Sequence, residues 1–148
     1  EKALTWCYND NQAICDITGK LYFAKTVAEE YSGTDLSDNI CPKGWHLPSR
    51  DEWVNLIFEY GFEESGKELY YGGRSDFNAL LGGYAAYRNY GQYEEFEADS
   101  IYKVAYFLTS EINTGSATTV QIVRDQNEVH FQTMPTQGYY SIRCIRDE

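Results

Sequence analysis

Four cysteines are the residues of this chain whose type and spacing bear most directly on chemistry. No two of them are spaced as C-x-x-C, and the chain has only two histidines, so a structural zinc site has little support. An even number at wide spacing fits two disulfides, for which three connectivities exist. Loop length favours pairing Cys7 with Cys15, across a short polar loop, and Cys41 with Cys144, from the middle of the chain to its last predicted strand.

The predicted disulfides indicate the cellular compartment of the protein. Disulfides persist in oxidising surroundings, so the sequence predicts an extracellular or cell-surface protein, either secreted or attached as a lipoprotein. The alternative is a cytosolic protein with four buried free thiols. Residues 1–6 lack the apolar segment of a signal peptide, so we expect an exported protein to be present here in processed form.

Aromatic residues recur at every third position between residues 84 and 96. Tyrosine combines a flat apolar ring with a hydroxyl, which suits stacking on sugar rings or filling pockets of a protein partner. We predict that Tyr87, Tyr90 and Tyr93 form a ligand-binding platform. The alternative is that Tyr84 and Phe96 pack inward and the other rings only cover the sheet.

An acidic run overlaps the end of this aromatic segment. Calcium prefers several oxygen ligands, and four carboxylates within six residues are weak candidates for such a site. The spacing lacks the regular alternation and the turn glycine of an EF-hand loop, so a solvated acidic loop is the favoured interpretation and no cofactor is expected. The four acidic residues are Glu94, Glu95, Glu97 and Asp99.

The sequence gives little support for catalysis. Cys41 and His46 are near each other in the chain, but a reactive cysteine needs a lowered pKa and access to solvent, and Cys41 is better explained as a disulfide partner. His46 stands between Trp45 and Leu47 and fits a core histidine with satisfied hydrogen bonds. No spacing among the 23 acidic residues singles out a carboxylate pair for glycoside hydrolysis, so we predict a protein that is not an enzyme.

Length and charge restrict the partners. The chain of 148 residues suits one domain over 1–148. Its net charge of −11 repels polyphosphate, so we expect no nucleic acid and no anionic membrane surface as partner. No apolar run approaches the ~18 residues of a bilayer span, so no membrane insertion is expected. An aromatic content of 16% is high and favours a recognition surface for a glycan or a cell-surface protein.

Two helices are predicted in the first half of the chain. Ser49 and Glu52 have the spacing of a capping box, and Gly61 supplies a stop for the helix that they begin. The apolar face of this helix consists of Trp53, Leu56, Ile57 and Tyr60. An earlier amphipathic helix is indicated by a stripe at roughly helical spacing, made of Leu21, Phe23, Ala24, Val27, Ala28 and Tyr31.

The second half has the period of β-strands. Residues 62–100 show little regular periodicity and are expected to form a long irregular loop region. Strands are predicted over 101–108, 118–124, 128–133 and 139–145. A hairpin tip at Gln126 and Asn127, with His130 beside it, is a further candidate for polar contacts to a ligand. Together these elements predict an α+β domain with a twisted antiparallel sheet.

One stretch resembles a known family, the Fibrobacter succinogenes major paralogous domain of bacterial secreted and surface proteins. The stretch is Ile40-Cys41-Pro42-Lys43-Gly44-Trp45-His46-Leu47-Pro48-Ser49, followed by Glu52-Trp53. Leu81 and Phe107 stand where the family tends to have Pro and Trp, which indicates local repacking. Further matching stretches, in family order, are Trp6-Cys7-Tyr8-Asn9 with Cys15, Gly19-Lys20-Leu21-Tyr22, Gly66-Lys67-Glu68-Leu69, Phe77-Asn78-Ala79-Leu80 with Gly82-Gly83-Tyr84, Thr109-Ser110-Glu111 and Ser141-Ile142-Arg143-Cys144-Ile145-Arg146-Asp147.

The resemblance implies a C-type-lectin-like fold related to the formylglycine-generating enzymes, with the chain ends close together, and it agrees with a Cys41–Cys144 bond. It brings no established catalytic activity. The Glu-Pro-Asn, Gln-Pro-Asp and Trp-Asn-Asp triplets of calcium-dependent sugar-binding lectins are absent from the chain. The copper-binding cysteine pair of the formylglycine-generating enzymes has no counterpart if both disulfides form.

We therefore expect an extracellular, non-enzymatic recognition or adhesion module that binds a glycan or a surface protein through its aromatic long-loop face. A structural or display role, as the head of a surface lipoprotein or filament, is the first alternative. An enzyme of the formylglycine-generating type is the second.

Overall fold

The computed structural model describes residues 5–31, 40–89 and 94–148. Short helices and strands alternate in the first half: β1 (Thr5–Trp6), the 3-10 turn η1 (Tyr8–Asp10), α1 (Gln12–Thr18), β2 (Leu21–Phe23), α2 (Ala24–Tyr31), β3 (Trp45–His46), α4 (Arg50–Tyr60) and α5 (Ser65–Leu69). The second half contains strands: β4 (Tyr84–Asn89), β5 (Glu94–Asp99), β6 (Val104–Ile112), β7 (Ser116–Val123), β8 (His130–Pro135), β9 (Gly138–Tyr140) and β10 (Ile145–Arg146). The predicted α+β class is confirmed.

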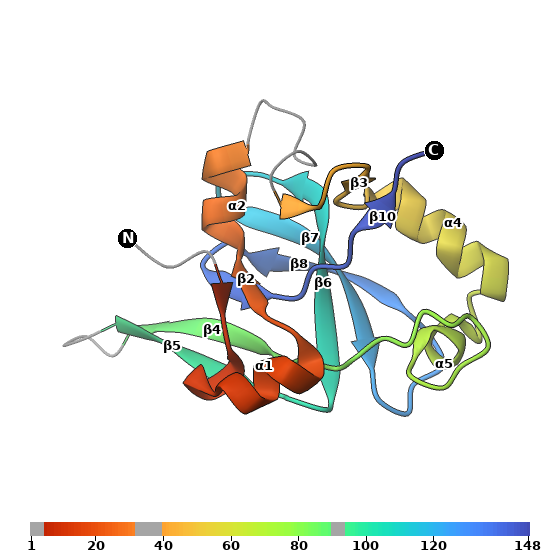
Figure 1. The fold of residues 1–148 in the computed structure, drawn as a ribbon, viewed down its shortest axis with the longest axis horizontal. Helices are drawn as coiled ribbons and strands as arrows, with labels where there is room; N and C mark the ends of the chain where they lie inside the picture. Colours follow the sequence, from red (N-terminus) through yellow and green to blue (C-terminus); the bar gives the residue numbers. More distant parts are fainter. Residues whose placement is uncertain (1–4, 32–39, 90–93) are drawn as a thin grey trace.

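The strands form three antiparallel sheets rather than the single sheet that the sequence predicted. Five strands pair in the order β1-β2-β9-β4-β5, three in the order β6-β7-β8, and β10 pairs with β3. Isolated parallel bridges, Gly83 with Ala105 and Phe107 with Ser141, connect the first two sheets. In Figure 1, β6–β8 occupy the centre of the molecule, β4 and β5 the lower left, and α4 and α5 the right. Within the described ranges no helix has the length and apolar character that crossing a membrane requires.

The helix expected over residues 21–31 begins later than predicted. Leu21 and Phe23 belong to β2, where Leu21 pairs with Trp6 of β1 and Phe23 pairs with Tyr139 of β9. These two residues are buried while Tyr22 between them is half-buried, which is the alternation of a strand. Because a three-residue strand runs directly into α2 at Ala24, the two apolar patterns merge into one apparent helical stripe.

The expectation of an irregular region over residues 62–100 is wrong in three places. Residues 65–69 form α5, and β4 pairs with β5 over six consecutive positions, from Tyr84 opposite Asp99 to Asn89 opposite Glu94. With α1 and α5, the described part of the first half has four α-helices, two more than predicted. Pairing between neighbouring strands depends on contacts outside the local sequence, so short elements with mixed polarity escape a periodicity argument.

The capping box before α4 is confirmed. The Ser49 hydroxyl accepts a hydrogen bond from the Glu52 amide at 3.1 Å, and the Glu52 carboxylate accepts one from the Ser49 amide at 3.0 Å. Gly61 ends the helix with φ of +79°, and its amide donates to the Phe58 carbonyl. This capping fixes where α4 begins and therefore which of its residues point into the core.

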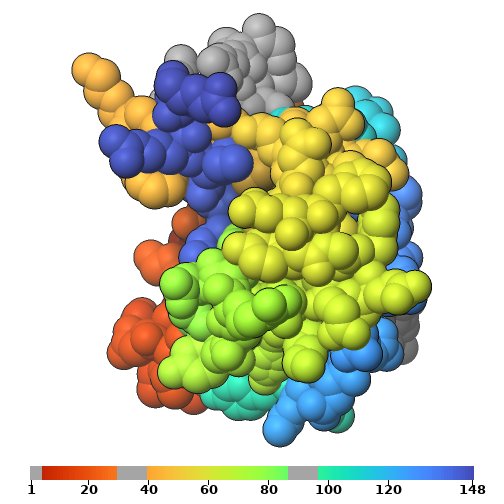
Figure 2. Space-filling model, turned by 90° about the vertical axis from the view of Figure 1, so that its right-hand side faces the viewer, coloured from red at the N-terminus to blue at the C-terminus, as the bar shows by residue number. Residues whose placement is uncertain are grey.

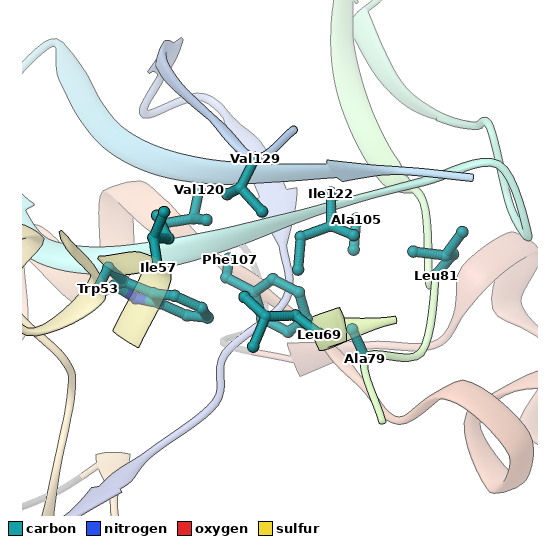
Figure 3. Packing of buried hydrophobic residues seen from close by; sticks show 10 residues of the cluster. All are labelled: Trp53, Ile57, Leu69, Ala79, Leu81, Ala105, Phe107, Val120, Ile122 and Val129. Atoms are coloured by element: carbon teal, nitrogen blue, oxygen red, sulfur yellow. The ribbon is translucent and has the colours of Figure 1, made fainter. Parts of the chain in front are cut away.

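The largest buried cluster lies between α4 and the β6–β7–β8 sheet (Figure 3). Trp53 and Ile57 reach it from α4, and Phe107 from β6. The Phe107 ring lies 5.6 Å from Trp53 and 6.0 Å from Phe77, centroid to centroid. The remaining buried members are Leu69, Ala79, Leu81, Ala105, Val120, Ile122 and Val129. This cluster joins the helical half of the chain to the strands of the second half.

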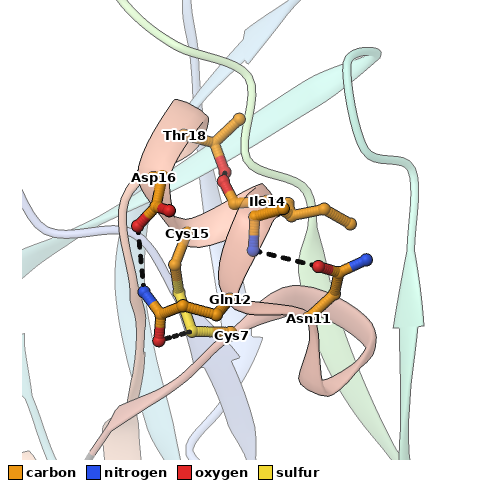
Figure 4. The surroundings of a disulfide bond; sticks show 8 residues. Cys7, Asn11, Gln12, Ile14, Cys15, Asp16 and Thr18 are labelled. Atoms are coloured by element: carbon orange, nitrogen blue, oxygen red, sulfur yellow. Dashed lines mark hydrogen bonds between the residues drawn. A yellow bond between two sulfur atoms is a disulfide. The ribbon is translucent and has the colours of Figure 1, made fainter.

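Both predicted disulfides are present in the structure. Cys7 bonds to Cys15, with Cα atoms 5.3 Å apart, and holds η1 against α1 (Figure 4). In the same segment the Asn11 side chain caps α1 by accepting a hydrogen bond from the Ala13 amide at 3.0 Å. The second disulfide joins positions 103 residues apart and contains Cys41 and Cys144.

Candidate functional site

The segment that carries the family resemblance is brought together with the end of the chain. In β3 and β10, His46 pairs with Ile145 and Trp45 pairs with Arg146. The Asp147 amide donates to the Gly44 carbonyl at 2.9 Å. Gly44 has φ of +86°, a backbone conformation that favours glycine. We call residues 41–53 and 143–147 the signature region.

His46 links three parts of the signature region. Its Nδ1 lies 2.6 Å from Oδ1 of Asp147, and its Nε2 lies 2.8 Å from Oε2 of Glu52 at the start of α4. Both ring nitrogens therefore face carboxylates, an arrangement that suits the imidazolium form. Because both nitrogens have a partner, the prediction of satisfied hydrogen bonds is confirmed. The side chain is 27% exposed, so the prediction of a core position is wrong.

The two carboxylates shift the titration of this group. Burial lowers the pKa of His46, but the hydrogen bonds to Asp147 and Glu52, together with their charges, outweigh it and raise the pKa above its usual value. Burial likewise raises the pKa of Glu52, but hydrogen bonds from Ser49 and His46 outweigh it and lower the pKa. Cys41 is bonded to Cys144, so no thiolate is available beside His46.

These shifts predict how stability depends on pH. The folded-state pKa of His46 lies above its unfolded value of 6.5, so its contribution to folding is complete below that pH and is lost as pH rises through the folded pKa. The contribution of Glu52 is present above its unfolded value of 4.5 and is lost as pH falls through its lowered pKa. Urea unfolding between about pH 6 and pH 9 should therefore show stability falling as pH rises.

The matched variants are His46→Ala and His130→Ala. Removal of His46 should lower the free energy of unfolding by about 1–3 kcal/mol near pH 6 and flatten the pH dependence, because both carboxylates lose their donor. Exposed His130 in β8 has one described ionic contact, 3.7 Å from Glu128, and its removal should leave the wild-type profile. A profile that stays equally steep without His46 would contradict this assignment.

A large cleft is lined by residues of α5, of the turn after it and of the tip of the β7–β8 hairpin. Figure 1 shows α5 and this hairpin tip at the lower right, beyond the end of α4. The volume of the cleft is about 1100 Å³. In Figure 2 the blue hairpin tip meets the green segment after α5 in the lower part of the face. We call it the hairpin cleft, and the lining residues that matter below are Tyr70, Tyr71, Arg74, Arg124, Gln126 and Asn127.

Gly66 attaches the hairpin tip to α5. Its amide donates to the Asn127 carbonyl at 2.6 Å. A Cβ at this position would lie 2.7 Å from the Gln126 carbonyl oxygen and 2.9 Å from that of Asn127, closer than side-chain carbons come to backbone oxygens. Only glycine therefore allows this approach, which sets the distance across the cleft.

Glu68 holds the turn on the α5 side of the cleft. Its carboxylate is 7% exposed and accepts hydrogen bonds from the Arg74 amide at 2.9 Å and the Arg74 Nε at 3.0 Å. The Ser75 hydroxyl donates to the Glu68 carbonyl at 2.6 Å. Arg74 stabilises the charged carboxylate and so lowers the pKa of Glu68. These bonds give the Tyr70–Arg74 turn a fixed shape, with the Arg74 guanidinium exposed.

A second hollow of about 550 Å³ adjoins the hairpin cleft and shares Tyr70, Tyr71 and Arg124 with it. Of the six residues that the second hollow adds, three are large, apolar and exposed: Ile17, Leu80 and Tyr102. Tyr71 is 69% exposed although it is a large aromatic residue. Exposed apolar groups gathered beside a polar cleft are a common feature of binding surfaces.

The structure places the predicted ligand-binding residues in two different regions. Gln126 and Asn127 line the hairpin cleft. Tyr87 belongs to β4, with Phe96 of β5 as its Cα partner, whereas Tyr90 and Tyr93 fall outside the described residues. Of the other repeat members, Tyr84 packs against Tyr106 at 5.2 Å between ring centroids, as the alternative interpretation expected. The platform formed by Tyr87, Tyr90 and Tyr93 stays a prediction.

The acidic run, Glu94, Glu95, Glu97 and Asp99, lies in β5 and not in a loop. Over the ranges that the structure describes, no group of three or more His, Cys, Asp or Glu residues is arranged to hold a metal ion.

Sequence reasoning missed the α5 side of the cleft. The available signal was Gly72-Gly73 directly after Tyr70-Tyr71, because paired glycines indicate a turn.

The sequence profile of the Fibrobacter succinogenes major domain matches residues 1–146, which is nearly the whole chain. The chain belongs to this family. No curated protein and no solved structure matched it. The resemblance found in the sequence is thus confirmed.

In this Fibrobacter succinogenes major domain, the most distinctive motif has structural duties. Gly44 makes a turn, His46 joins Glu52 to Asp147, and Ser49 caps α4, while Cys41 bonds to Cys144. The hairpin cleft uses other residues, at the far end of α4. The motif that identifies the family therefore does not line the hairpin cleft.

Proposed function

We propose that this domain is an extracellular, non-enzymatic recognition module of C-type-lectin-like fold that binds a glycan at the hairpin cleft and the adjoining hollow. The observation that carries the proposal is the exposed ring of Tyr71, shared by the two hollows and flanked by the guanidinium of Arg124 and the amides of Gln126 and Asn127. Flat rings beside planar polar groups match the two faces of a sugar, apolar C–H and hydroxyl.

The extracellular assignment rests on the two disulfides, which suit an oxidising compartment. Early and late segments also lie side by side, as a C-type-lectin-like chain requires. β9 pairs with β2, and β10 pairs with β3. The triplets that hold calcium in sugar-binding lectins are absent from the sequence, so binding should not depend on calcium.

A surface protein is the second candidate ligand. Ile17 and Leu80 expose aliphatic side chains in the same hollow as Tyr102, and contiguous exposed apolar groups are typical of protein interaction sites. A partner of this kind would cover the hollow on the α1 side and leave Gln126 and Asn127 at the rim.

The decisive prediction concerns Tyr71. Glycan arrays with and without calcium should identify a ligand, and Tyr71→Ala should weaken its affinity by about tenfold or more, because the exposed ring supplies the stacking surface. Phe58→Ala is the matched control, since Phe58 is 60% exposed on α4 and lines neither hollow. Calorimetry with the best glycan measures both variants.

Other results would redirect the assignment. Binding that survives Tyr71→Ala but is lost in Tyr90→Ala with Tyr93→Ala would move the site to the predicted platform. Blank arrays together with self-assembly would favour the structural or display role. Formylglycine formation with bound copper, and with reduced thiols in the native protein, would favour the enzyme alternative.

A further inference from the structure

The signature region contains a further, smaller pocket, which shares no lining residue with the hairpin cleft. Its volume is about 280 Å³, and we call it the signature pocket. Its lining is largely apolar and comes from Trp45, Pro48, Trp53, Leu56 and Phe77. In Figure 2 the orange residues of β3 and the dark-blue end of the chain meet the yellow start of α4 in this part of the face.

The indole of Trp53 forms part of the wall of this pocket. Trp53 is 3% exposed, and its indole Nε1–H has no acceptor among the described residues. The ring is fixed by Phe77 at 5.5 Å and Phe107 at 5.6 Å between centroids. Figure 3 shows the benzene part of the indole directed toward Phe107 and the nitrogen on the side away from it. Trp53 therefore gives the pocket a rigid aromatic wall, with its Nε1–H buried beneath the accessible surface.

Two arginines give the pocket a positive charge in an acidic protein. The Arg143 guanidinium lies 4.2 Å from the centroid of the Phe77 ring, and Arg146 lines the pocket from β10. Within the described ranges neither of them has a carboxylate at ion-pair distance. Glu52, the acidic residue of the lining, already binds His46 and Ser49. The positive charge is therefore available to a ligand.

We propose that the signature pocket binds a small aromatic carboxylate. The ring would lie among Trp45, Leu56 and Phe77, and the carboxylate would accept hydrogen bonds from the guanidinium of Arg143. The volume equals that of roughly nine water molecules at about 30 Å³ each, which suits one or two fused rings with a short acid chain. The same chemistry is offered by a free acid and by the aromatic C-terminal residue of a peptide.

Paired probes test the proposal. Indole-3-propionate stands for the free acid and N-acetyltryptophan for a peptide end, and each has an uncharged amide as its control. Calorimetry should show at least one acid binding about tenfold or more tightly than its amide, because only the acid uses the charge of Arg143. In amide-proton NMR spectra of the labelled protein, that acid should shift the Trp53 indole signal, assigned with Trp53→Phe, and leave that of Trp6 in place.

Variants of Arg143 test whether its charge, and not a change in the fold, causes the preference for the acid. Arg143→Gln should lose the preference for the acid and Arg143→Lys should keep most of it, while circular dichroism shows both to be folded. Arg124→Gln removes a charge of the hairpin cleft and should leave this binding unchanged, so the result is independent of the proposed glycan site.

The probe that binds identifies the source of the ligand. Binding of indole-3-propionate indicates a free acid, and binding of N-acetyltryptophan indicates the C-terminal residue of a peptide. Equal affinity of acids and amides, an unmoved Trp53 signal, or full acid preference in Arg143→Gln would each overturn the proposal.

Discussion

Replacement of Cys41 and Cys144 together by alanine is expected to lower the free energy of unfolding by about 4–5 kcal/mol. The bond closes a loop with a separation of 103 residues, and in the chain-entropy model a loop of about 100 residues contributes ~4.7 kcal/mol by restricting the unfolded chain. For a domain of this size the loss corresponds to a melting temperature roughly 10–20 °C lower. Guanidinium unfolding of the oxidised protein and the double variant measures it.

The other disulfide provides the control. Cys7 and Cys15 are separated by 8 residues, so their joint replacement should cost less than about 3 kcal/mol by the same model. Equal losses in the two double variants would contradict the loop-entropy account. They would show instead that local packing around each bond, or structure in the unfolded chain, determines its contribution.

Phe107→Ala should also be strongly destabilising, with a loss of about 3–5 kcal/mol in the free energy of unfolding. The ring is buried where β6 meets α4, in contact with Trp53 and Phe77, and its removal leaves a cavity among rings that cannot close over it. Urea unfolding at constant pH, with the slope checked for two-state behaviour, gives the value.

Phe58→Ala removes the same kind of ring from an exposed position on α4. Phe58 contacts Phe62 at 4.5 Å between centroids, but both rings lie at the surface, so the change should be within about 0.5 kcal/mol. A comparable loss in the two variants would mean that the cluster around Phe107 contributes no more than surface packing. The fold described here would then need another source of stability.

Parts of the molecule that are encoded locally were predictable. The capping box at Ser49 and Glu52, with Gly61 as the stop, located α4 because the signals for a helix end lie within a few residues. The disulfide pairing followed from loop length, and the family followed from a contiguous motif in which Cys41, Gly44, His46 and Ser49 have structural roles. The hairpin tip at Gln126 and Asn127 was found from the break between two β patterns.

The parts that were missed depend on contacts between distant segments. β2 is three residues long and exists because β1 and β9 pair with it on both sides. The hairpin cleft requires Gly66 to contact Asn127, which is 61 positions further along the chain. A hydrophobic periodicity describes only neighbouring positions, so it cannot predict this contact. The unpaired indole of Trp53 is likewise a property of the packed state, because the sequence shows only an apolar position on a helix.

The long-range disulfide also determines how tension would pass through the molecule. A pull applied at the two ends of the chain would travel from residue 41 to residue 144 through the sulfur–sulfur bond, bypassing everything between them. Residues 5–31, with β1, β2 and α2, lie outside this loop and could be drawn out, which would remove Ile17 from the adjoining hollow. The residues between Cys41 and Cys144, with α4 and every residue that lines the hairpin cleft, could not be extended while the bond is intact, so a ligand held in that cleft would keep its contacts.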